Sequence, residues 1–372
     1  MKVIIDKNIP FIHGVLEPWA NVEYVEGSRI NRDLVATADA MIIRTRTKCN
    51  KSLLENTGIR FIGTATIGTD HIDLEWCRAH GIKCASAPGC NSGSVMQYLA
   101  SALVYLTPKY GIEPVNTTLG VVGVGNVGSK VARMAEILGF NILINDPPRE
   151  RLEGKQGFSS IDRILDESDI VSIHVPLTFE GTDKTYQLVN ENFLSKMKNK
   201  AILINTSRGQ VVDERALLEQ LKKSIIETAV LDVWRNEPDI NIELLDAVDI
   251  GTAHIAGYSA DGKANGGKMI IRQLAEYFDL PLKEWKSEKL PVPDDPVIDI
   301  SGYKGSDLDI ISKAILHTYS IENDSSILKK NPSLFEKLRN EYSGRREFHA
   351  YTVKGNNRLI LNKLYALGFK SH

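Results

Sequence analysis

The sequence contains little cysteine and no excess of charge of either sign. Its 372 residues include only four cysteines, Cys49, Cys77, Cys84 and Cys90, and no two of them form a C-x-x-C pair. This sparse spacing excludes a disulfide framework and disfavours a zinc site. The 45 lysines and arginines nearly balance the 47 aspartates and glutamates, so the formal net charge is −2. We therefore expect no binding of nucleic acid through bulk positive charge.

Hydrophobic runs are also short throughout the chain. No run approaches the ~18 apolar residues that cross a bilayer, and Asp6 interrupts the first apolar run after three residues. We expect no membrane segment, no secretory signal and a cytoplasmic location. The composition, with 42% hydrophobic and 25% charged residues, is typical of a globular protein rather than a disordered one.

Short apolar runs alternate with helical stretches, which is typical of parallel α/β folds. We expect a substrate-binding lobe at residues 1–94, completed by residues 257–285, and a doubly wound Rossmann-type sheet at residues 95–256. Apolar residues at helical spacing predict helices at residues 94–106 and 268–278. The predicted strands are bounded by polar residues or glycine, and they are residues 3–5, 40–43, 60–62, 83–85, 119–122, 142–144, 170–173, 201–204 and 229–231.

The composition changes after residue 285. Residues 286–296 contain three prolines and no periodic apolar face, so they predict a linker. Residues 297–372 predict a small C-terminal α+β domain with a strand at residues 348–353. A domain below ~80 residues is marginally stable alone, and this segment has no cysteine. We therefore expect residues 297–372 to be supported by association with another chain, as a dimerisation domain.

The segment GVGNVG, residues 123–128, lies between a predicted strand and a predicted helix at residues 127–138. Glycines in a G-x-G-x-x-G turn permit a tight turn and the close approach of a pyrophosphate, which the helix N-terminus also attracts. A second strand ends at Asp146, eighteen residues after Gly128. A carboxylate near this interval binds the ribose hydroxyls and repels a 2′-phosphate. The unit predicts NAD rather than NADP, with cofactor-binding residues Gly123, Gly125, Asn126, Val127, Gly128 and Asp146.

Asp146 also has a simpler interpretation. It precedes Pro147 and Pro148, and aspartate is common at turns of this kind. The complete strand–turn–helix–strand arrangement favours the cofactor role.

Three polar segments follow the later predicted strands, at the sheet edge where open α/β folds bind ligands. Arg208 comes directly before Gly209, where its guanidinium can bind a carboxylate through two parallel hydrogen bonds. A surface salt bridge is the alternative role for this arginine. The sequence thus offers Arg208 as a candidate catalytic residue.

Glu237 and His254 form a candidate charge pair. A hydroxyl that is oxidised by hydride loss also loses a proton, and histidine can accept a proton near neutral pH. A neighbouring carboxylate orients the imidazole ring and favours its protonated form. A lone histidine after a strand is more often structural, so the spacing by itself leaves both interpretations open.

The segment Asp70-His71-Ile72-Asp73 could be interpreted as a metal site. We expect its acidic residues to cap a helix that begins there. Hydride transfer to NAD needs no metal, so no metal site is predicted.

Residues 205–214, 231–238 and 252–258 resemble the signature regions of the D-isomer-specific 2-hydroxyacid dehydrogenases, and the resemblance covers residues 1–285. It implies that Arg208 binds the substrate carboxylate and carbonyl, that Glu237 supports His254 and that His254 is the acid–base. It also implies contacts at further positions. For the substrate these are Thr45, Thr66 and Tyr258, and for the cofactor they are Val175, Thr206, Ser207, Asp232 and Gly257.

Four more segments, residues 86–91, 146–148, 249–266 and 335–347, resemble one member of this family along the whole chain. That likeness implies an NAD-dependent oxidoreductase whose substrate is a phosphorylated 2-hydroxy acid, in a homodimer. Because each of the two lobes supplies part of the site, we also expect the lobes to close around the substrate. Two alternatives remain open. One is another D-2-hydroxyacid dehydrogenase, such as a phosphoglycerate dehydrogenase, and the other is an NAD-sensing corepressor-like binding protein.

The adjacent Arg345 and Arg346 precede the predicted C-terminal strand at residues 348–353. Two neighbouring cations are unfavourable without a partner. We expect either a salt bridge to acidic residues across the dimer interface or a contact of one arginine with the substrate phosphate in the other subunit.

Overall fold

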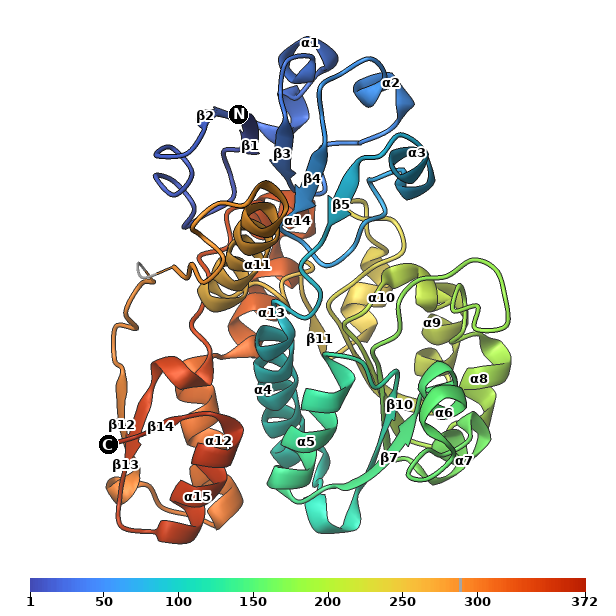
Figure 1. Cartoon of the computed structure of the whole chain (residues 1–372). Coiled ribbons are helices and arrows are strands. Elements are labelled where there is room, and N and C mark those ends of the chain that lie inside the picture. Colours follow the sequence, from blue (N-terminus) through green and yellow to red (C-terminus); the bar gives the residue numbers. More distant parts are fainter. Residues whose placement is uncertain (288–289) are drawn as a thin grey trace. The chain divides into compact units, whose positions relative to one another are not determined.

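The computed structural model describes residues 1–287 and 290–372. Backbone contacts divide the chain into two compact units, with one parallel sheet in unit 1 and two in unit 2 (Figure 1). Unit 1 comprises Met1–Asn91 and Ser259–Pro291, and unit 2 comprises Ser92–Tyr258 and Val292–His372. The predicted linker at residues 286–296 spans the second boundary, and its residues 288 and 289 lie outside the described residues.

Unit 1 is built on a parallel sheet with the strand order β2-β1-β3-β4-β5. The strands are β1 (Lys2–Asp6), β2 (Asn21–Val25), β3 (Ala40–Ile43), β4 (Phe61–Thr64) and β5 (Lys83–Ala85). The short connecting helices are η1 (Gly27–Arg29), α1 (Arg32–Val35), α2 (Lys51–Leu54) and α3 (Leu74–Ala79). The sequence missed β2 because its residues NVEYV are only partly buried and carry two polar side chains.

A long helix, α11 (Ala260–Phe278), returns to unit 1 and packs on β4. Gly63 in β4 permits this approach, because a Cβ atom there would lie 2.3 Å from Cγ2 of Ile270. The helix begins eight residues before its predicted start, at a point where the Ser259 hydroxyl accepts a hydrogen bond from the Gly262 amide. The first part of the helix contains three glycines, and glycine has a low helix propensity, so the sequence did not predict a helix there.

Unit 2 contains the doubly wound parallel sheet that the sequence predicts, with the strand order β11-β10-β9-β8-β6-β7. Its strands are β6 (Thr118–Val122), β7 (Asn141–Asn145), β8 (Ile170–Ile173), β9 (Ala201–Asn205), β10 (Ile226–Leu231) and β11 (Ile250–Gly251). Its helices are α4 (Ser92–Tyr110), η2 (Pro114–Asn116), α5 (Gly128–Leu138), α6 (Pro147–Glu153), α7 (Ile161–Glu167), α8 (Glu191–Lys196), η3 (Gly209–Val211), α9 (Glu214–Lys222) and α10 (Ile242–Ala247). The strand order reverses between β6 and β8, and open α/β sheets bind ligands at such a point.

The C-terminal segment contains a small parallel sheet with the order β12-β13-β14. Its elements are β12 (Val297–Asp299), η4 (Ile300–Gly302), α12 (Asp307–Thr318), α13 (Ile321–Lys330), η5 (Pro332–Leu334), α14 (Phe335–Asn340), η6 (Phe348–Ala350), β13 (Thr352–Lys354), α15 (Arg358–Leu367) and β14 (Lys370–Ser371). The predicted strand at residues 348–353 is wrong in its first half, which forms η6.

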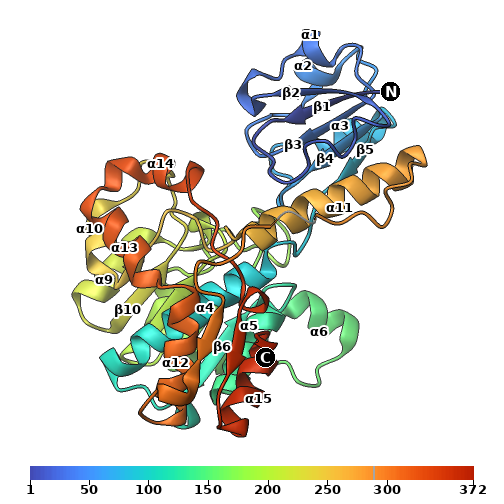
Figure 2. The same ribbon diagram turned by 90° about the vertical axis from the view of Figure 1, so that its left-hand side faces the viewer.

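This segment shares a hydrophobic core with the part of unit 2 that carries the six-stranded sheet. Ile298, Ile311, Ile315 and Val353 belong to the same buried cluster as residues of α4 and α5. Helices α12 and α13 pack on α4, and α15 packs on α5 (Figure 2). The segment thus gains support from its own chain, so its small size does not by itself require a second copy.

Arg345 joins the C-terminal segment to α4 and to the loop that follows β11. Its guanidinium lies 4.1 Å from the centre of the Tyr319 ring. It donates to the carbonyl oxygens of Ser94 at 3.0 Å and Ala256 at 2.6 Å and to the Gln97 side chain at 3.1 Å. For Arg345 both sequence-based expectations are therefore wrong, because its donors are used within its own unit.

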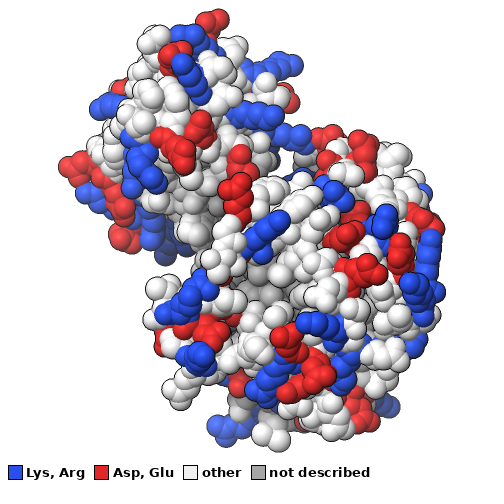
Figure 3. Space-filling view, turned by 90° about the vertical axis from the view of Figure 1, so that its right-hand side faces the viewer, with Lys and Arg blue, Asp and Glu red and all other residues white. Residues whose placement is uncertain are grey.

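The charges of the surface are mixed. On the face that Figure 3 shows, lysines and arginines are interspersed with aspartates and glutamates, and neither sign forms one continuous area. Within residues 1–287 and 290–372, no helix has both the length and the hydropathy to cross a membrane.

We expect Arg345→Leu to lower the free energy of unfolding by about 3 kcal/mol, since it leaves buried carbonyl oxygens without a donor. It also removes the cation that favours ionised Asp324, a carboxyl whose pKa is raised mainly by burial. Urea unfolding measures the change. Lys363→Ala, which removes an exposed charge on α15, should change the stability by less than about 0.5 kcal/mol. Equal stability of the two variants would contradict the anchoring role of Arg345.

Candidate active site

The glycine-rich turn connects β6 to α5. A Cβ atom at Gly123 would lie 2.7 Å from the His174 carbonyl oxygen, and one at Gly128 would lie 1.9 Å from the Gly123 carbonyl oxygen. Packing within the protein therefore requires these two glycines. At Gly125, by contrast, an added Cβ would meet no heavy atom within 4 Å beyond its chain neighbours. This open side of the turn fits the close approach of a pyrophosphate.

Asp146 stands at the end of β7, beside the glycine-rich turn. Its Oδ2 accepts a hydrogen bond from the Val124 amide at 2.8 Å, and its Oδ1 accepts one from the Arg149 amide at 3.1 Å. The residue thus caps α6 and also holds its carboxylate against the turn, so the two predicted roles are compatible. The guanidinium of Arg149 forms two 2.7 Å hydrogen bonds with Glu153, which offsets its charge.

Three other predicted cofactor residues follow β8 and β9. Val175 lies next to the glycine-rich turn, because its Cγ1 would be 2.9 Å from a Cβ at Gly123. The Ser207 amide and hydroxyl both donate to Asn205 Oδ1, at 3.0 and 2.8 Å. Thr206 Oγ1 lies 3.4 Å from Nδ1 of His174.

His174 is a polar residue of this region that the sequence did not single out. Its Nε2 lies 2.8 Å from the Ser172 hydroxyl, and burial lowers the pKa of its imidazole to about 3. The ring is therefore neutral and acts as a hydrogen-bonding link between β8 and Thr206.

Asp232 shapes the loop that carries His254. Its buried carboxylate accepts hydrogen bonds from the Thr252 hydroxyl at 2.7 Å, the Ile255 amide at 2.7 Å and the Ala256 amide at 2.9 Å. The Asp232 carbonyl oxygen accepts the His254 amide at 2.8 Å. His254 itself has the left-handed backbone angle φ of 55°, which these bonds stabilise. The cofactor contacts of Asp232 and of nearby Gly257 stay predictions.

The structure brings Glu237 and His254 together. Nδ1 of His254 lies 2.7 Å from Oε2 of Glu237, and the side chains are 25% and 17% exposed. Oε1 of Glu237 accepts the Trp234 amide at 3.0 Å. Burial opposes ionisation of Glu237, but the hydrogen bond and charge of His254, the charge of Arg339 and the Trp234 amide outweigh it, so the pKa of Glu237 is lowered. Among the described residues none forms a hydrogen bond with Nε2 of His254, so this nitrogen can serve a substrate.

Arg208 lies on the neighbouring loop after β9. Its carbonyl oxygen accepts the Asn205 side-chain amide at 3.0 Å, and its Nη1 donates to the Ser207 carbonyl at 2.9 Å. Gly209 lets this loop pack on the loop that carries Glu237, because a Cβ there would lie 2.0 Å from the Trp234 carbonyl carbon. The loop that carries Arg208 and the loop that carries Glu237 are thus in direct contact.

The remaining predicted substrate residues lie on different units. Thr45 and Thr66 belong to unit 1, in the loops that follow β3 and β4. Thr66 Oγ1 lies 2.6 Å from Thr64 Oγ1, and Arg44 beside Thr45 pairs with the buried Asp6 at 3.1 Å. Tyr258 belongs to unit 2. Their contacts with substrate stay predictions.

One charged residue of the site escaped the sequence argument. Arg339 of α14 reaches Oε2 of Glu237 with Nη1 at 3.3 Å and the Tyr258 hydroxyl with Nε at 3.3 Å. Arg339 is 102 residues from Glu237 along the chain, so no local motif connects the two. The only available signal was its position within the family-like segment 335–347.

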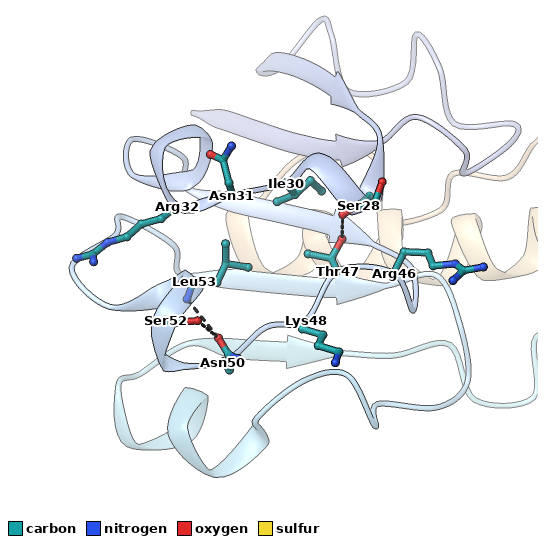
Figure 4. Close-up of a pocket in the computed structure, with 11 residues that line it drawn as sticks. Ser28, Ile30, Asn31, Arg32, Arg46, Thr47, Lys48, Asn50, Ser52 and Leu53 are labelled. Atoms are coloured by element: carbon teal, nitrogen blue, oxygen red, sulfur yellow. Dashed lines mark hydrogen bonds between the residues drawn. The ribbon is translucent and has the colours of Figure 1, made fainter. Parts of the chain in front are cut away.

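A hollow in unit 1 is lined mainly by polar residues, but their side chains do not point towards one common position (Figure 4). Asn31 and Asn50 cap α1 and α2, and Thr47 donates to the Gly27 carbonyl oxygen. Arg32 and Arg46 extend towards opposite sides of the hollow (Figure 4). None of the predicted site residues lines it.

Within the acidic segment at residues 70–73, Asp73 has the capping role that the sequence predicts. Asp73 accepts the Trp76 amide at 2.9 Å and begins α3. His71 Nε2 lies 3.2 Å from the Thr64 hydroxyl. In the described part of the chain no group of three or more histidine, cysteine, aspartate or glutamate side chains could hold a metal ion.

We expect the double variant Asp146→Ser, Glu153→Gln to bind NADP at least ten times more tightly relative to NAD than the natural chain does. The change removes a carboxylate that repels the 2′-phosphate and releases Arg149 to attract it. Isothermal titration calorimetry with each cofactor gives the ratio of dissociation constants. Glu153→Gln alone keeps Asp146 and should keep the preference for NAD. An unchanged ratio in the double variant would remove Asp146 from cofactor choice.

Comparison with known proteins identifies two domains in the chain. Residues 105–256 match the model of the D-isomer specific 2-hydroxyacid dehydrogenase NAD-binding domain, and residues 290–368 match a domain of unknown function, DUF3410. The first match confirms an NAD-binding domain. It agrees with the glycine-rich turn and the strand order of unit 2.

Solved structures share this fold. A D-lactate dehydrogenase from Aquifex aeolicus, complexed with NAD and lactic acid, is 26% identical with a TM-score of 0.62, and the match covers 78% of this chain and 99% of that one. An NAD-dependent formate dehydrogenase from Staphylococcus aureus, in complex with NAD, is 21% identical with a TM-score of 0.59 and covers 79% and 99% of the two chains. The second likeness concerns the fold alone.

Curated relatives match over nearly the full length. The erythronate-4-phosphate dehydrogenase of Bacteroides thetaiotaomicron is 47% identical, over 95% of this chain and 99% of the relative. The enzyme of the same name from Klebsiella pneumoniae is 37% identical over 100% of this chain and 98% of the relative. The chain therefore belongs to the erythronate-4-phosphate dehydrogenase family, within the D-isomer-specific 2-hydroxyacid dehydrogenases.

Proposed function

We propose that this chain oxidises 4-phospho-D-erythronate to 2-oxo-3-hydroxy-4-phosphobutanoate with NAD, as a step in the biosynthesis of pyridoxal 5′-phosphate. The observation that carries the proposal is the 2.7 Å contact between His254 and Glu237, with Nε2 of His254 left for a substrate. The pair occurs in a chain whose named relatives match along 95–100% of its length.

In this proposal each residue of the candidate catalytic set has one task. Arg208 binds the substrate carboxylate through its planar donors. His254 accepts the hydroxyl proton at Nε2, while Glu237 holds Nδ1 and stabilises the imidazolium that results. Thr45, Thr66 and Tyr258 make the remaining contacts with the substrate.

NAD, when bound, supplies the hydride acceptor for this oxidation. The residues proposed to hold it are those of the glycine-rich turn, the acid at the end of β7 and the loops after β8, β9, β10 and β11. They are Gly123, Gly125, Asn126, Val127, Gly128, Asp146, Val175, Thr206, Ser207, Asp232 and Gly257.

The two alternatives differ from the proposal in testable ways. Another D-2-hydroxyacid dehydrogenase would use the same acid–base pair with a different acid, and a corepressor-like protein would bind NAD without turnover. Incubation of the full chain with NAD and 4-phospho-D-erythronate, 3-phospho-D-glycerate or D-lactate separates them by the absorbance of NADH. We expect kcat/KM to be at least tenfold higher for 4-phospho-D-erythronate. A preference for 3-phospho-D-glycerate, or NAD binding without any turnover, would overturn the proposal.

The proposal extends to a cytoplasmic homodimer. Large apolar side chains lie exposed in the C-terminal segment, among them Leu359 at 71% and Val297 at 42% exposure, and exposed apolar surface favours association. We expect sedimentation equilibrium to give twice the mass of one chain at micromolar concentration. A single-chain mass over the whole concentration range would contradict the dimer.

We expect His254→Asn to fold and to bind NAD normally while kcat falls about 10²- to 10⁴-fold, the usual contribution of a general base. Steady-state kinetics and calorimetry with NAD measure the two effects. His13→Asn, a change at an exposed histidine of unit 1, should leave kcat unchanged. A kcat for His254→Asn within twofold of the natural enzyme would show that another group takes the proton.

A further inference from the structure

We propose that Arg339 is a positioning residue for catalysis, which shares the Glu237 carboxylate with His254 and thereby keeps the imidazole able to accept a proton. The inference rests on the proposed function, since it concerns the acid–base step of that reaction. It gives the C-terminal segment, whose matching domain has no known function, a task at the active site of its own chain.

The Glu237 carboxylate is held from three directions. Oε1 accepts the Trp234 amide at 3.0 Å, and Oε2 accepts both His254 Nδ1 at 2.7 Å and Arg339 Nη1 at 3.3 Å. The histidine and the arginine therefore compete for the charge of one oxygen atom. Arg339 also donates from Nε to the Tyr258 hydroxyl at 3.3 Å, so it contacts a residue on each of the two loops that meet at His254.

Helix α14 fixes the position of Arg339. Phe335, at the start of α14, is 1% exposed and belongs to the buried cluster on one face of the central sheet, and Leu338 packs against that cluster. The Arg339 side chain is 26% exposed. Burial disfavours its charge, but the neighbouring Tyr258 and Glu237 outweigh burial and raise the pKa of the guanidinium. Arg339 is therefore a cation at every pH at which the enzyme works.

A constant cation on this oxygen changes the balance of the pair. A carboxylate beside an imidazole favours the protonated ring, and a protonated ring cannot take the hydroxyl proton. A positive charge that shares the carboxylate weakens this effect and also disfavours a second positive charge nearby. Without Arg339, the charge of the Glu237 carboxylate would act on the imidazole of His254 alone.

The other charged and titratable groups around the pair are few and have their own partners. Glu214, on α9, accepts the Arg235 amide at 2.7 Å, and burial raises its pKa. The Asp232 carboxylate is bound to the loop that carries His254, and Arg235 is exposed. Tyr258 faces the pair through its contact with Arg339. Within the described chain no lysine or second arginine forms an ion pair with Glu237.

The test compares Arg339→Gln and Arg339→Lys with Lys337→Gln. Lys337 is a matched control, because it lies on the same helix, its side chain is 61% exposed and it pairs only distantly with Glu341 at 4.0 Å. We measure kcat/KM against pH with 4-phospho-D-erythronate and with D-erythronate, which lacks the phosphate. For Arg339→Gln we expect the pH of half-maximal kcat/KM to rise by about one unit, equally for both substrates. Arg339→Lys should restore most of the shift, and Lys337→Gln should show none.

A second readout does not depend on turnover. In full-length protein with ¹⁵N-labelled histidine, the His254 signals are assigned by their loss in His254→Asn, and their midpoint is followed against pH by NMR. A midpoint that rises by about one unit in Arg339→Gln supports the inference even if the natural chain oxidises none of the tested acids. An unchanged midpoint overturns it even if the natural chain oxidises 4-phospho-D-erythronate.

Two further outcomes complete the test. If Arg339→Gln only raises KM for the phosphorylated substrate and leaves both pH profiles in place, Arg339 binds the phosphate and the inference is wrong. If Arg339→Gln fails to fold by circular dichroism, Arg339→Lys decides. A midpoint within about 0.3 units of the natural value then supports a requirement for positive charge, and a rise equal to one unit contradicts it.

Discussion

The loop that carries His254 depends on opposite charges that hold its backbone from two sides. The buried carboxylate of Asp232 accepts the amides of Ile255 and Ala256, and the guanidinium of Arg345 donates to the carbonyl oxygens of Ala256, Ile255 and Tyr258 at 2.6, 3.3 and 3.5 Å. An anion thus satisfies the N–H groups of the loop and a cation satisfies its carbonyls. Because charge-assisted hydrogen bonds are stronger than neutral ones, they can stabilise the left-handed backbone of His254.

This arrangement explains why the C-terminal segment matters to a site built on the central sheet. Arg345 holds the backbone beneath His254, and Arg339 contacts the carboxylate that pairs with His254. Both arginines belong to the C-terminal segment. Part of this segment shares a buried cluster with α4 and α5, and Phe335 of α14 belongs to a second cluster with residues of the central sheet. The segment is therefore a structural part of the unit that carries the candidate site, and any role in association would be additional to this one.

Much of the fold could be predicted because its signals are local. Buried strands of a parallel sheet are nearly continuous apolar runs, so β3 and β8 have the bounds that the sequence predicts. The bounds of β5 also agree with the prediction, although its first residue, Lys83, is exposed. The glycine-rich turn and Asp146 lie within one short unit of strand, turn, helix and strand. Partly polar strands such as β2 contain no such run, so the sequence did not predict them. The first turns of α11 were not predicted either, because they contain glycines.

The contacts of the site that the sequence missed are long-range. Arg345 is 251 residues from Ser94 and 89 from Ala256 along the chain, and no spacing rule relates an arginine to a carbonyl so far away. The sequence suggested that Arg345 and Arg346 need acidic partners. That argument considered only charged side chains, whereas Arg345 donates to backbone carbonyl oxygens. The sequence offered Glu237 and His254 as a candidate pair because each follows a strand of the same sheet, and parallel strands bring their carboxyl ends together. Their roles came from the family resemblance, since the spacing left a structural histidine equally open.

The most direct test of the account is a crystal structure of the full chain with NADH and 4-phospho-D-erythronate. The account predicts that the 2-hydroxyl oxygen lies about 2.6–3.2 Å from Nε2 of His254, within reach of proton transfer, and that the substrate carboxylate contacts Arg208. A substrate whose 2-hydroxyl contacts another acid–base group, with Nε2 of His254 facing away from it, would contradict the assignment.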